Sequence, residues 1–217
     1  MRRKINVQYV TRSSFKQEEV EQILQSTTVN TPDGERIIAG DAFTFEFGGV
    51  PTDEPLERDL EAMVRHKVRS AYRQVLAPCI VEHAGIILQD YVSKNYPGGL
   101  SQPMWDALGA EGFAKSVAWA GSQVVARAVI GYCNGLRILT FVGETRGCLC
   151  GEPRGARDFY WDTIFCPEGG DGLTYSEIAS GPDGLAEKVK LSQSTKAMGK
   201  FLQYLLRDNT SMFPYMP

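Results

Sequence analysis

The sequence predicts an α/β protein, in which helices flank a β-sheet, and three local patterns support this prediction. Apolar and polar residues alternate over residues 5–9, as in a strand, and the spacing becomes helical from Phe15. A short apolar run at residues 79–81 is typical of a buried central strand. Two stretches rich in β-branched residues, 123–133 and 136–142, flank turn residues and predict a hairpin.

The N-terminal part is expected to contain one strand, two helices and a long loop region. After the first strand, a Thr-Arg-Ser-Ser loop leads into a helix whose apolar face carries Val20 and Ile23. Gly, Asp, Pro and Thr then cluster between residues 31 and 53, which indicates loops around an extended piece at 42–47. From residue 54 to about residue 74, apolar residues recur at helical spacing and predict a long helix.

The strand at 79–81 leads directly into Glu82 and His83, which we place at its end. A Pro-Gly-Gly loop and a helical stretch around Trp105 follow. The pair Asn134-Gly135 favours a tight two-residue hairpin turn.

Residues 143–184 are rich in Gly and Pro, yet they carry large apolar side chains that are expected to line a cavity or a core. The last helix is predicted from about residue 192 to 207, and residues 208–217 are expected to be peripheral.

Composition predicts one globular domain over residues 1–217. The chain is 43% hydrophobic and 23% charged, which is enough to bury a core. A net charge of -3 argues against nucleic-acid binding, because neutralising many phosphates requires a surplus of Lys and Arg. No segment approaches the roughly 20 apolar residues that cross a membrane, and the first residues are too polar for a signal peptide. We therefore expect a cytoplasmic protein that binds neither nucleic acid nor membranes.

The cysteines are expected to be reduced thiols. Their number is odd and they show no repeated pair spacing, which argues against a disulfide framework. Cys148 and Cys150 form one C-x-C pair, but a metal clip would need a second pair or a nearby histidine. The remaining cysteines are Cys79, Cys133 and Cys166.

Two groups of charged residues are candidates for phosphate and metal binding. Lys16 opens a helix beside Ser13 and Ser14, where an ammonium and backbone N–H groups could bind an anion. The alternative is an ordinary solvated lysine. Glu46 and Glu82 adjoin apolar segments and could hold Mg²⁺ together with phosphate oxygens. The alternative is a pair of ordinary strand-end acids.

Two further candidates concern catalysis and base recognition. His83 could accept a proton near neutral pH, or it could be a hydrogen-bonded structural histidine. The stretch Phe159-Tyr160-Trp161-Asp162 offers aromatic faces and an acid, which suit stacking and edge recognition of a planar base. The alternative for the aromatic residues is core packing.

Several motifs, in order and spacing, resemble the inosine triphosphate pyrophosphatase family, whose members hydrolyse non-canonical purine nucleoside triphosphates to monophosphate and pyrophosphate. The resemblance covers residues 5 to 206. Residues 11–16 are similar to the family's Thr-Gly-Asn-x-x-Lys phosphate loop, and residues 80–85 to its strand ending in Glu/Asp-Asp-Ser/Thr-Gly. Other similar segments are 46–49, the Pro-Gly loop at 97–99, the base-pocket stretch 154–165, residues 174–177, and Lys188 with Ser192.

The resemblance implies an elongated mixed β-sheet with flanking helices and two lobes around a central nucleotide cleft. It also implies a homodimer, a Mg²⁺ cofactor and a purine nucleoside triphosphate as ligand. The implied metal residues are Glu46 and Glu82, and the implied catalytic residues are His83, Glu82 and Lys16. The implied substrate-binding residues are Thr11, Arg12, Ser13, Lys16, Phe159, Trp161, Asp162, Lys188, Ser192, Gln193 and Ser194.

The departures from the family pattern fall at the implied site. His83 stands where the family has an acid that supports Mg²⁺ or the attacking water, and imidazole is a poor ligand for this hard cation. Gln193-Ser194 replaces a His-Arg pair, and Gln102 aligns with a lysine. Arg12 and Ser13 replace the loop's glycine and asparagine. These changes suggest that ligand binding is kept and turnover is reduced.

Three hypotheses of function follow. The first is a nucleotide sensor that binds ITP, dITP or XTP with weak or absent hydrolysis and signals to a partner protein. The second is an active Mg²⁺-dependent pyrophosphohydrolase with shifted specificity, in which His83 serves as the base. The third is a structural role without a nucleotide.

Overall fold

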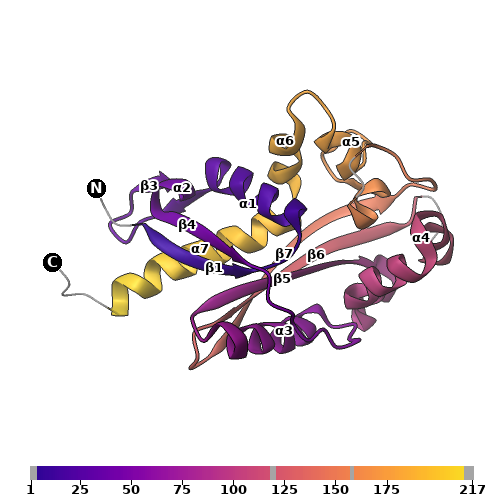
Figure 1. Ribbon diagram of the computed structural model, residues 1–217. Helices are drawn as coiled ribbons and strands as arrows, with labels where there is room; N and C mark the ends of the chain where they lie inside the picture. Colours follow the sequence, from indigo (N-terminus) through magenta and orange to yellow (C-terminus); the bar gives the residue numbers. More distant parts are fainter. Residues whose placement is uncertain (1–3, 118–120, 157–158, 213–217) are drawn as a thin grey trace.

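The computed structural model describes residues 4–117, 121–156 and 159–212, and contains a mixed sheet with helices on both faces (Figure 1). The predicted α/β class is confirmed. The strands are β1 (Ile5–Val10), β2 (Thr28–Asn30), β3 (Arg36–Ile38), β4 (Phe43–Gly48), β5 (Cys79–Leu88), β6 (Gln123–Cys133), β7 (Ile138–Leu149) and β8 (Phe165–Pro167). The α-helices are α1 (Ser14–Ser26), α2 (Ala39–Ala42), α3 (Leu60–Val75), α4 (Ser101–Val117), α5 (Tyr175–Ala179), α6 (Gly184–Leu191) and α7 (Gln193–Met212). The 3-10 helices are η1 (Gln89–Lys94), η2 (Gly98–Leu100) and η3 (Tyr160–Thr163).

The main sheet has six strands in the order β4-β1-β5-β6-β7-β8. β1 runs parallel to both β4 and β5, whereas β5 to β8 pair antiparallel. β1 pairs with β5 at Gln8↔Cys79 and Tyr9↔Ile80, so β5 continues well past the carboxyl end of β1. In α/β sheets, ligands commonly bind beside the carboxyl ends of parallel strands. Glu82 and His83 therefore lie beside such an end although they are inside their own strand.

Two sequence predictions about strands are corrected. The strand predicted at 79–81 has ten residues, because β6 pairs along its whole length and the polar residues at 82 and 83 are buried within it. The predicted two-residue turn at Asn134-Gly135 is a four-residue loop, closed by the pair Cys133↔Ile138. Asn134 stabilises this loop, since its side-chain oxygen accepts from the backbone N–H groups of residues 136 and 137.

Two helix boundaries also differ from the prediction. α3 begins at Leu60 rather than at residue 54, because Asp59 caps it by accepting from the N–H groups of residues 61 and 62 at 2.8 and 3.3 Å. α7 continues to Met212 rather than ending near residue 207. Residues 213–217 of the predicted peripheral tail lie outside the described residues.

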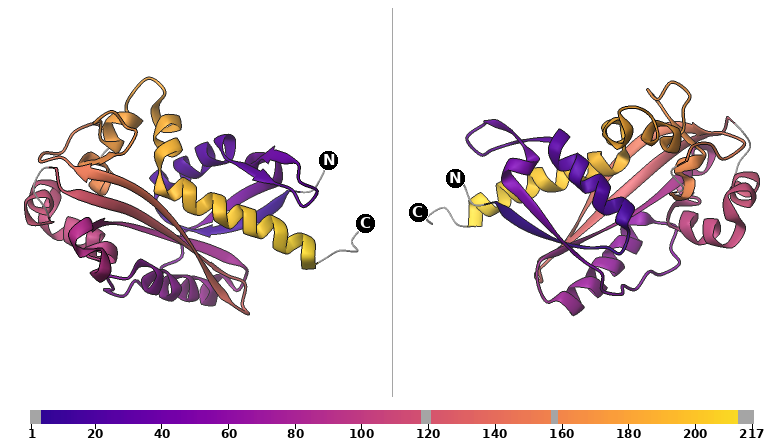
Figure 2. Two further views of the ribbon diagram at one scale, coloured as in Figure 1. Left: turned by 180° about the vertical axis from the view of Figure 1, so that it is seen from behind. Right: turned by 45° about the horizontal axis from the view of Figure 1, so that its top comes forward.

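Helices cover both faces of the sheet, because successive strand residues point to opposite sides. In β6, Ala128 and Ile130 pack with α1 and α7, whereas Val129 and Cys133 pack with α3. Figure 2 shows α7 lying along the sheet on the face opposite α3. A further core cluster lies beneath α4, η3 and α5. Within the described residues, no helix is both long and apolar enough to cross a membrane.

Candidate functional site

A cleft of about 560 Å³ lies at the carboxyl end of β1. This volume is within the range of roughly 300–1,000 Å³ that is usual for small-molecule sites. The cleft brings together most of the predicted site residues. Those that line it are Thr11, Arg12, Ser13, Lys16, Glu82, His83, Phe159, Trp161, Asp162, Lys188, Gln193 and Ser194.

The loop between β1 and α1 presents a helix N-terminus to the cleft. Ser13 is the N-cap of α1, and its hydroxyl accepts from the backbone N–H of Lys16 at 3.4 Å. The Thr11 hydroxyl in turn accepts from the Ser13 N–H at 3.2 Å. The partial positive charge of a helix N-terminus favours anions, and the Lys16 ammonium adds a full charge beside it.

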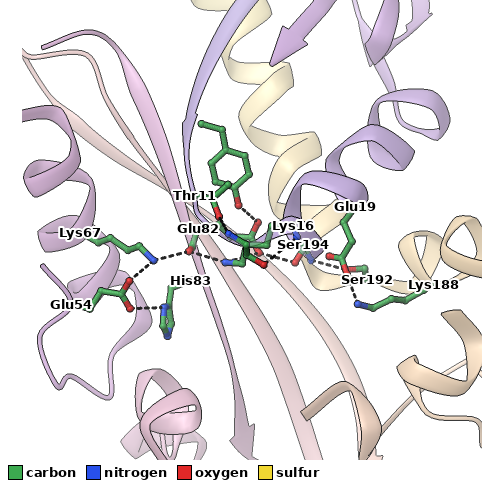
Figure 3. Close-up of polar contacts among 12 residues, drawn as sticks. Thr11, Lys16, Glu19, Glu54, Lys67, Glu82, His83, Lys188, Ser192 and Ser194 are labelled. Atoms are coloured by element: carbon green, nitrogen blue, oxygen red, sulfur yellow. Dashed lines mark hydrogen bonds and ion pairs between the residues drawn. The ribbon is translucent and has the colours of Figure 1, made fainter. Parts of the chain in front are cut away.

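Glu82 occupies the centre of the cleft wall and is 5% exposed. Its carboxylate accepts from the Tyr9 hydroxyl at 3.1 Å and from the Ser194 hydroxyl at 2.9 Å, and the Lys16 ammonium lies 3.9 Å away (Figure 3). Burial and the nearby Glu82 charge raise the pKa of Tyr9, so this phenol stays a proton donor. These donors compensate the cost of burying the carboxylate.

Two lysines approach the Glu82 backbone carbonyl from different helices. Lys16 of α1 donates to this oxygen at 2.9 Å and Lys67 of α3 at 3.4 Å, and Lys67 is also 2.7 Å from Glu54 (Figure 3). Burial and then the charge of Lys16 lower the pKa of Lys67. An anion between the two ammonium groups would relieve their mutual repulsion, which suits phosphate oxygens.

Lys67 and Glu54 were not among the predicted site residues. Lys67 did carry a signal, because it falls on the apolar stripe of α3 between Met63 and Val68, and a charged side chain is rarely buried there without a partner. Glu54 carried no such signal, because the sequence pattern places it inside a helix, whereas α3 begins only at Leu60.

The surroundings of His83 weaken the hypothesis that it accepts a proton near pH 7. Burial, followed by the charges of Lys67 and Lys16, lowers its pKa to about 3, although Nδ1 lies 3.7 Å from a Glu54 carboxylate oxygen. Its Nε2 is buried without a hydrogen-bond partner among the described residues. Strand alternation separates it from Glu82: it pairs with Val129 on the α3 face, and Glu82 pairs with Ile130 on the α7 face.

A buried ion-pair triad closes the other side of the cleft. The Lys188 ammonium is 2.5 Å from a carboxylate oxygen of Glu19 and 2.5 Å from one of Asp162. Burial alone would lower the pKa of Lys188, but Asp162 and Glu19 raise it overall. A phosphate at Lys188 would compete with both carboxylates. Glu19 was missed in the sequence, although it lies on the buried face of α1 beside Val20.

The predicted aromatic stretch divides between the cleft and the core. Phe159 stacks on Phe15 with ring centroids 4.8 Å apart, and both rings line the cleft. Trp161 is 5% exposed and packs edge-on against Phe165 at 5.7 Å, so core packing accounts for most of its surface. Phe15 was not predicted, and residues 157 and 158 of the motif lie outside the described residues.

Three polar residues singled out in the sequence, Ser192, Gln193 and Gln102, have different roles. The Gln193 side-chain oxygen accepts from the Tyr175 hydroxyl at 3.0 Å, and Gln193 lines the cleft. Ser192 does not line it; this buried side chain accepts from the Ser194 N–H at 3.1 Å and holds the start of α7. Gln102 lines the cleft and donates to the Tyr160 hydroxyl at 2.9 Å.

The described residues do not fit a magnesium ion held by protein ligands. Glu46 is exposed and lies outside the cleft, because Phe45 and Phe47 on either side of it turn toward the core. The structure therefore does not bring Glu46 to Glu82, contrary to the predicted metal pair. Glu54 is occupied by Lys67 and faces an imidazole, which is a poor Mg²⁺ ligand. No group of three metal-ligating His, Cys, Asp or Glu side chains occurs in the part of the chain that the structure describes.

Comparison with known proteins identifies the family of this fold and cleft. A sequence model of the Ham1 family matches residues 7–204. The chain belongs to the Ham1 family. A dITP/XTP pyrophosphatase of Methanopyrus kandleri is 34% identical over 166 residues, which cover 75% of this chain and 84% of that protein. One of Methanothermobacter marburgensis is 30% identical over 151 residues, covering 69% and 76%.

Solved structures support the same fold for this Ham1-family chain. A HAM1 protein from Coxiella burnetii superposes with a TM-score of 0.63 at 18% identity, covering 94% of this chain and 99% of that one. The Ham1 protein of Staphylococcus aureus gives a TM-score of 0.61 at 13% identity, covering 94% and 100%. The resemblance inferred from the motifs is confirmed, as is the mixed sheet flanked by helices.

Proposed function

We propose that this Ham1-family chain binds a non-canonical purine nucleoside triphosphate, such as ITP, dITP or XTP, in the cleft. The names of its relatives as dITP/XTP pyrophosphatases support this ligand class. The triphosphate would lie against the N-terminus of α1, between the ammonium groups of Lys16 and Lys67. The base would lie at Phe15 and Phe159, near the side chain of Gln193.

We further propose that the chain is a sensor with weak or absent hydrolysis. The observation that carries this step is the position of His83, whose imidazole lies 3.7 Å from Glu54 and adds no second acid beside Glu82. Burial also lowers the pKa of this imidazole. Glu82 itself already accepts from Tyr9 and Ser194, so its carboxylate is held as part of the fold. Electrostatic groups suited to capture an anionic ligand are thus present, while groups that would activate water are weak.

The second candidate is an active pyrophosphohydrolase that releases monophosphate and pyrophosphate. Identity of 34% to a dITP/XTP pyrophosphatase favours it, together with the presence of Glu82 at the centre of the cleft. A homodimer and a cytoplasmic location complete the proposal for either candidate. For the sensor, a separate effector protein would read the nucleotide-bound state.

One experiment separates the two candidates. Calorimetry with ITP, dITP, XTP, GTP and ATP, with Mg²⁺ and with EDTA, measures binding, and pyrophosphate release is followed on the same samples. The sensor hypothesis expects binding of a non-canonical nucleotide without turnover near an ordinary enzymatic rate of roughly 1 per second. Turnover at that rate would establish the hydrolase instead. Binding of no nucleotide under either condition would refute both.

A further inference from the structure

Three cysteines lie at the strand pair β7–β8. Cys148 of β7 pairs directly with Cys166 of β8. Cys150 lies one residue past the end of β7, where its N–H still donates to the Ile164 carbonyl oxygen at 2.9 Å. Neighbours on the same face of an antiparallel pair have Cβ atoms roughly 4.5–8 Å apart, including the diagonal ones. The fold therefore brings Cys166 to two cysteines that precede it by 16 and 18 residues in the sequence.

Contacts within this group distinguish Cys150 and Cys166 from the other thiols. Their thiol groups lie close enough to interact with each other. The guanidinium of Arg154 lies 3.3 Å from the Cys166 sulfur, and the Cys150 sulfur lies 3.0 Å from the Glu152 carbonyl oxygen. Cys150 is partly exposed, whereas Cys166 is buried. One sulfur of the pair is therefore open to small reagents and the other lies behind it.

The same contacts set the protonation of the two thiols. The hydrogen bond from Cys166 and the charge of Arg154 lower the pKa of Cys150 to about 6, although burial opposes this shift. That hydrogen bond and burial raise the pKa of Cys166. A lowered pKa increases the share of Cys150 that is the thiolate, the form that reacts with oxidants.

A second pair of neighbouring cysteines in the chain serves as a comparison. Cys79 and Cys133 also face each other across neighbouring strands, β5 and β6. Both are buried, and burial raises the pKa of Cys79 to about 12. This second pair has cross-strand proximity but neither an exposed sulfur nor a nearby cation that stabilises a thiolate.

We propose that Cys150 and Cys166 form a peroxide-sensitive dithiol, a modification site outside the nucleotide cleft. The Cys150 thiolate attacks one oxygen of a hydroperoxide, breaks its O–O bond and becomes a sulfenic acid, and the other oxygen leaves as water or an alcohol after protonation. The Cys166 sulfur then attacks the Cys150 sulfur, loses its proton and expels the sulfenic oxygen as water. Two thiols are oxidised to one disulfide, and one peroxide is reduced by two electrons.

The cysteine pair adjoins a segment that forms part of the cleft wall, so its oxidation would affect the cleft. β8 begins two residues after η3, and η3 carries Trp161 and Asp162 of the cleft wall. The Cys150 sulfur also lies 3.7 Å from the carbonyl oxygen of Thr163, the last residue of η3. The two sulfurs therefore belong to the segment that holds this wall in place.

The test treats the reduced full-length protein with an equimolar amount of hydrogen peroxide, blocks remaining thiols with an alkylating reagent, and maps peptides by mass spectrometry. We expect a disulfide that links Cys150 to Cys166, while Cys79 and Cys133 stay alkylated. Cys148→Ser is the matched control and should keep the disulfide, whereas Cys150→Ser should lose it. In wild type, the rate of Cys150 alkylation should reach half its maximum near pH 6.

Three results would overturn the proposal. The first is an equally fast disulfide in Cys150→Ser, which would assign the reaction to Cys148. The second is oxidation of Cys79 with Cys133 at the same rate, which would show that proximity alone suffices. The third is accumulation of Cys150 sulfinic acid without a disulfide in wild type, which would remove Cys166 as the resolving thiol. The wild-type measurement decides the case even if a variant fails to fold.

Discussion

Replacing Lys67 by methionine should weaken triphosphate binding without weakening the fold. Methionine keeps most of the apolar volume on the inward stripe of α3 and removes the charge. A hydrogen bond to a charged group contributes about 1.5–3 kcal/mol. Lys67 already contacts Glu54 at 2.7 Å, and part of that contact must be exchanged for phosphate. We therefore expect the lower half of this range, a loss of about 10- to 40-fold in affinity.

The same structure predicts the sign of the stability change. Burial lowers the pKa of Lys67, so the unfolded state binds this proton more strongly than the folded state does. Lys67 then opposes folding at neutral pH, and its unfavourable contribution disappears as the pH rises above the ordinary lysine pKa. Glu54 is 36% exposed and stays hydrated when its partner is removed. The free energy of unfolding in Lys67→Met should be unchanged or higher.

Calorimetry with the triphosphate and with the matching nucleoside is the assay, and urea unfolding reports stability. The nucleoside should bind wild type and Lys67→Met equally. Lys115→Met is the matched control, because Lys115 is 77% exposed on α4 and lies outside the cleft. Wild-type triphosphate affinity should also fall as the pH rises through the lowered pKa of Lys67, since binding then requires proton uptake. Equal losses for both ligands would refute the phosphate assignment.

Three further variants test other parts of the site. Lys188→Met should lower the free energy of unfolding by about 3–5 kcal/mol in urea titrations, because Glu19 and Asp162 would remain buried without their cation; a loss below about 1 kcal/mol would contradict the triad. His83→Asp should raise Mg²⁺-dependent pyrophosphate release by about tenfold or more, equivalent to about 1.4 kcal/mol, and an unchanged rate would mean that the imidazole is not limiting. Phe159→Ala should cost about 1–3 kcal/mol of nucleoside affinity by calorimetry with an unchanged circular dichroism spectrum, and full affinity would place the base elsewhere.

The fold was largely predictable because each strong pattern had a local cause. The alternation before Val10 and the cap at Ser13 fix β1 and α1 within a few residues. The length of β5 was not predictable in this way. Glu82 and His83 look like the end of a strand in the sequence, but their burial depends on Tyr9 and on other partners far along the chain.

The candidate site was predictable where a motif fixes a residue to a loop, and less so where only tertiary contacts define it. The loop motif brought Thr11, Ser13 and Lys16 to the cleft. The prediction that Glu46 lies in the cleft is not met, because strand alternation, which the motif does not encode, turns its side chain to solvent. Lys67 was detectable only as a charge within an apolar stripe, and its partner could not be named from the sequence.

The contacts of Glu82 bear on the choice between sensor and enzyme. Its carboxylate is held by Tyr9 of β1 and Ser194 of α7, and its carbonyl oxygen by lysines of α1 and α3. A ligand shifts a conformational equilibrium only through contacts that differ between the two states. A triphosphate that drew Lys16 and Lys67 from this carbonyl to its own oxygens would tie α1 to α3 through the ligand. Binding alone would then change how helices of the two sheet faces are held, and a signal of that kind needs no hydrolysis.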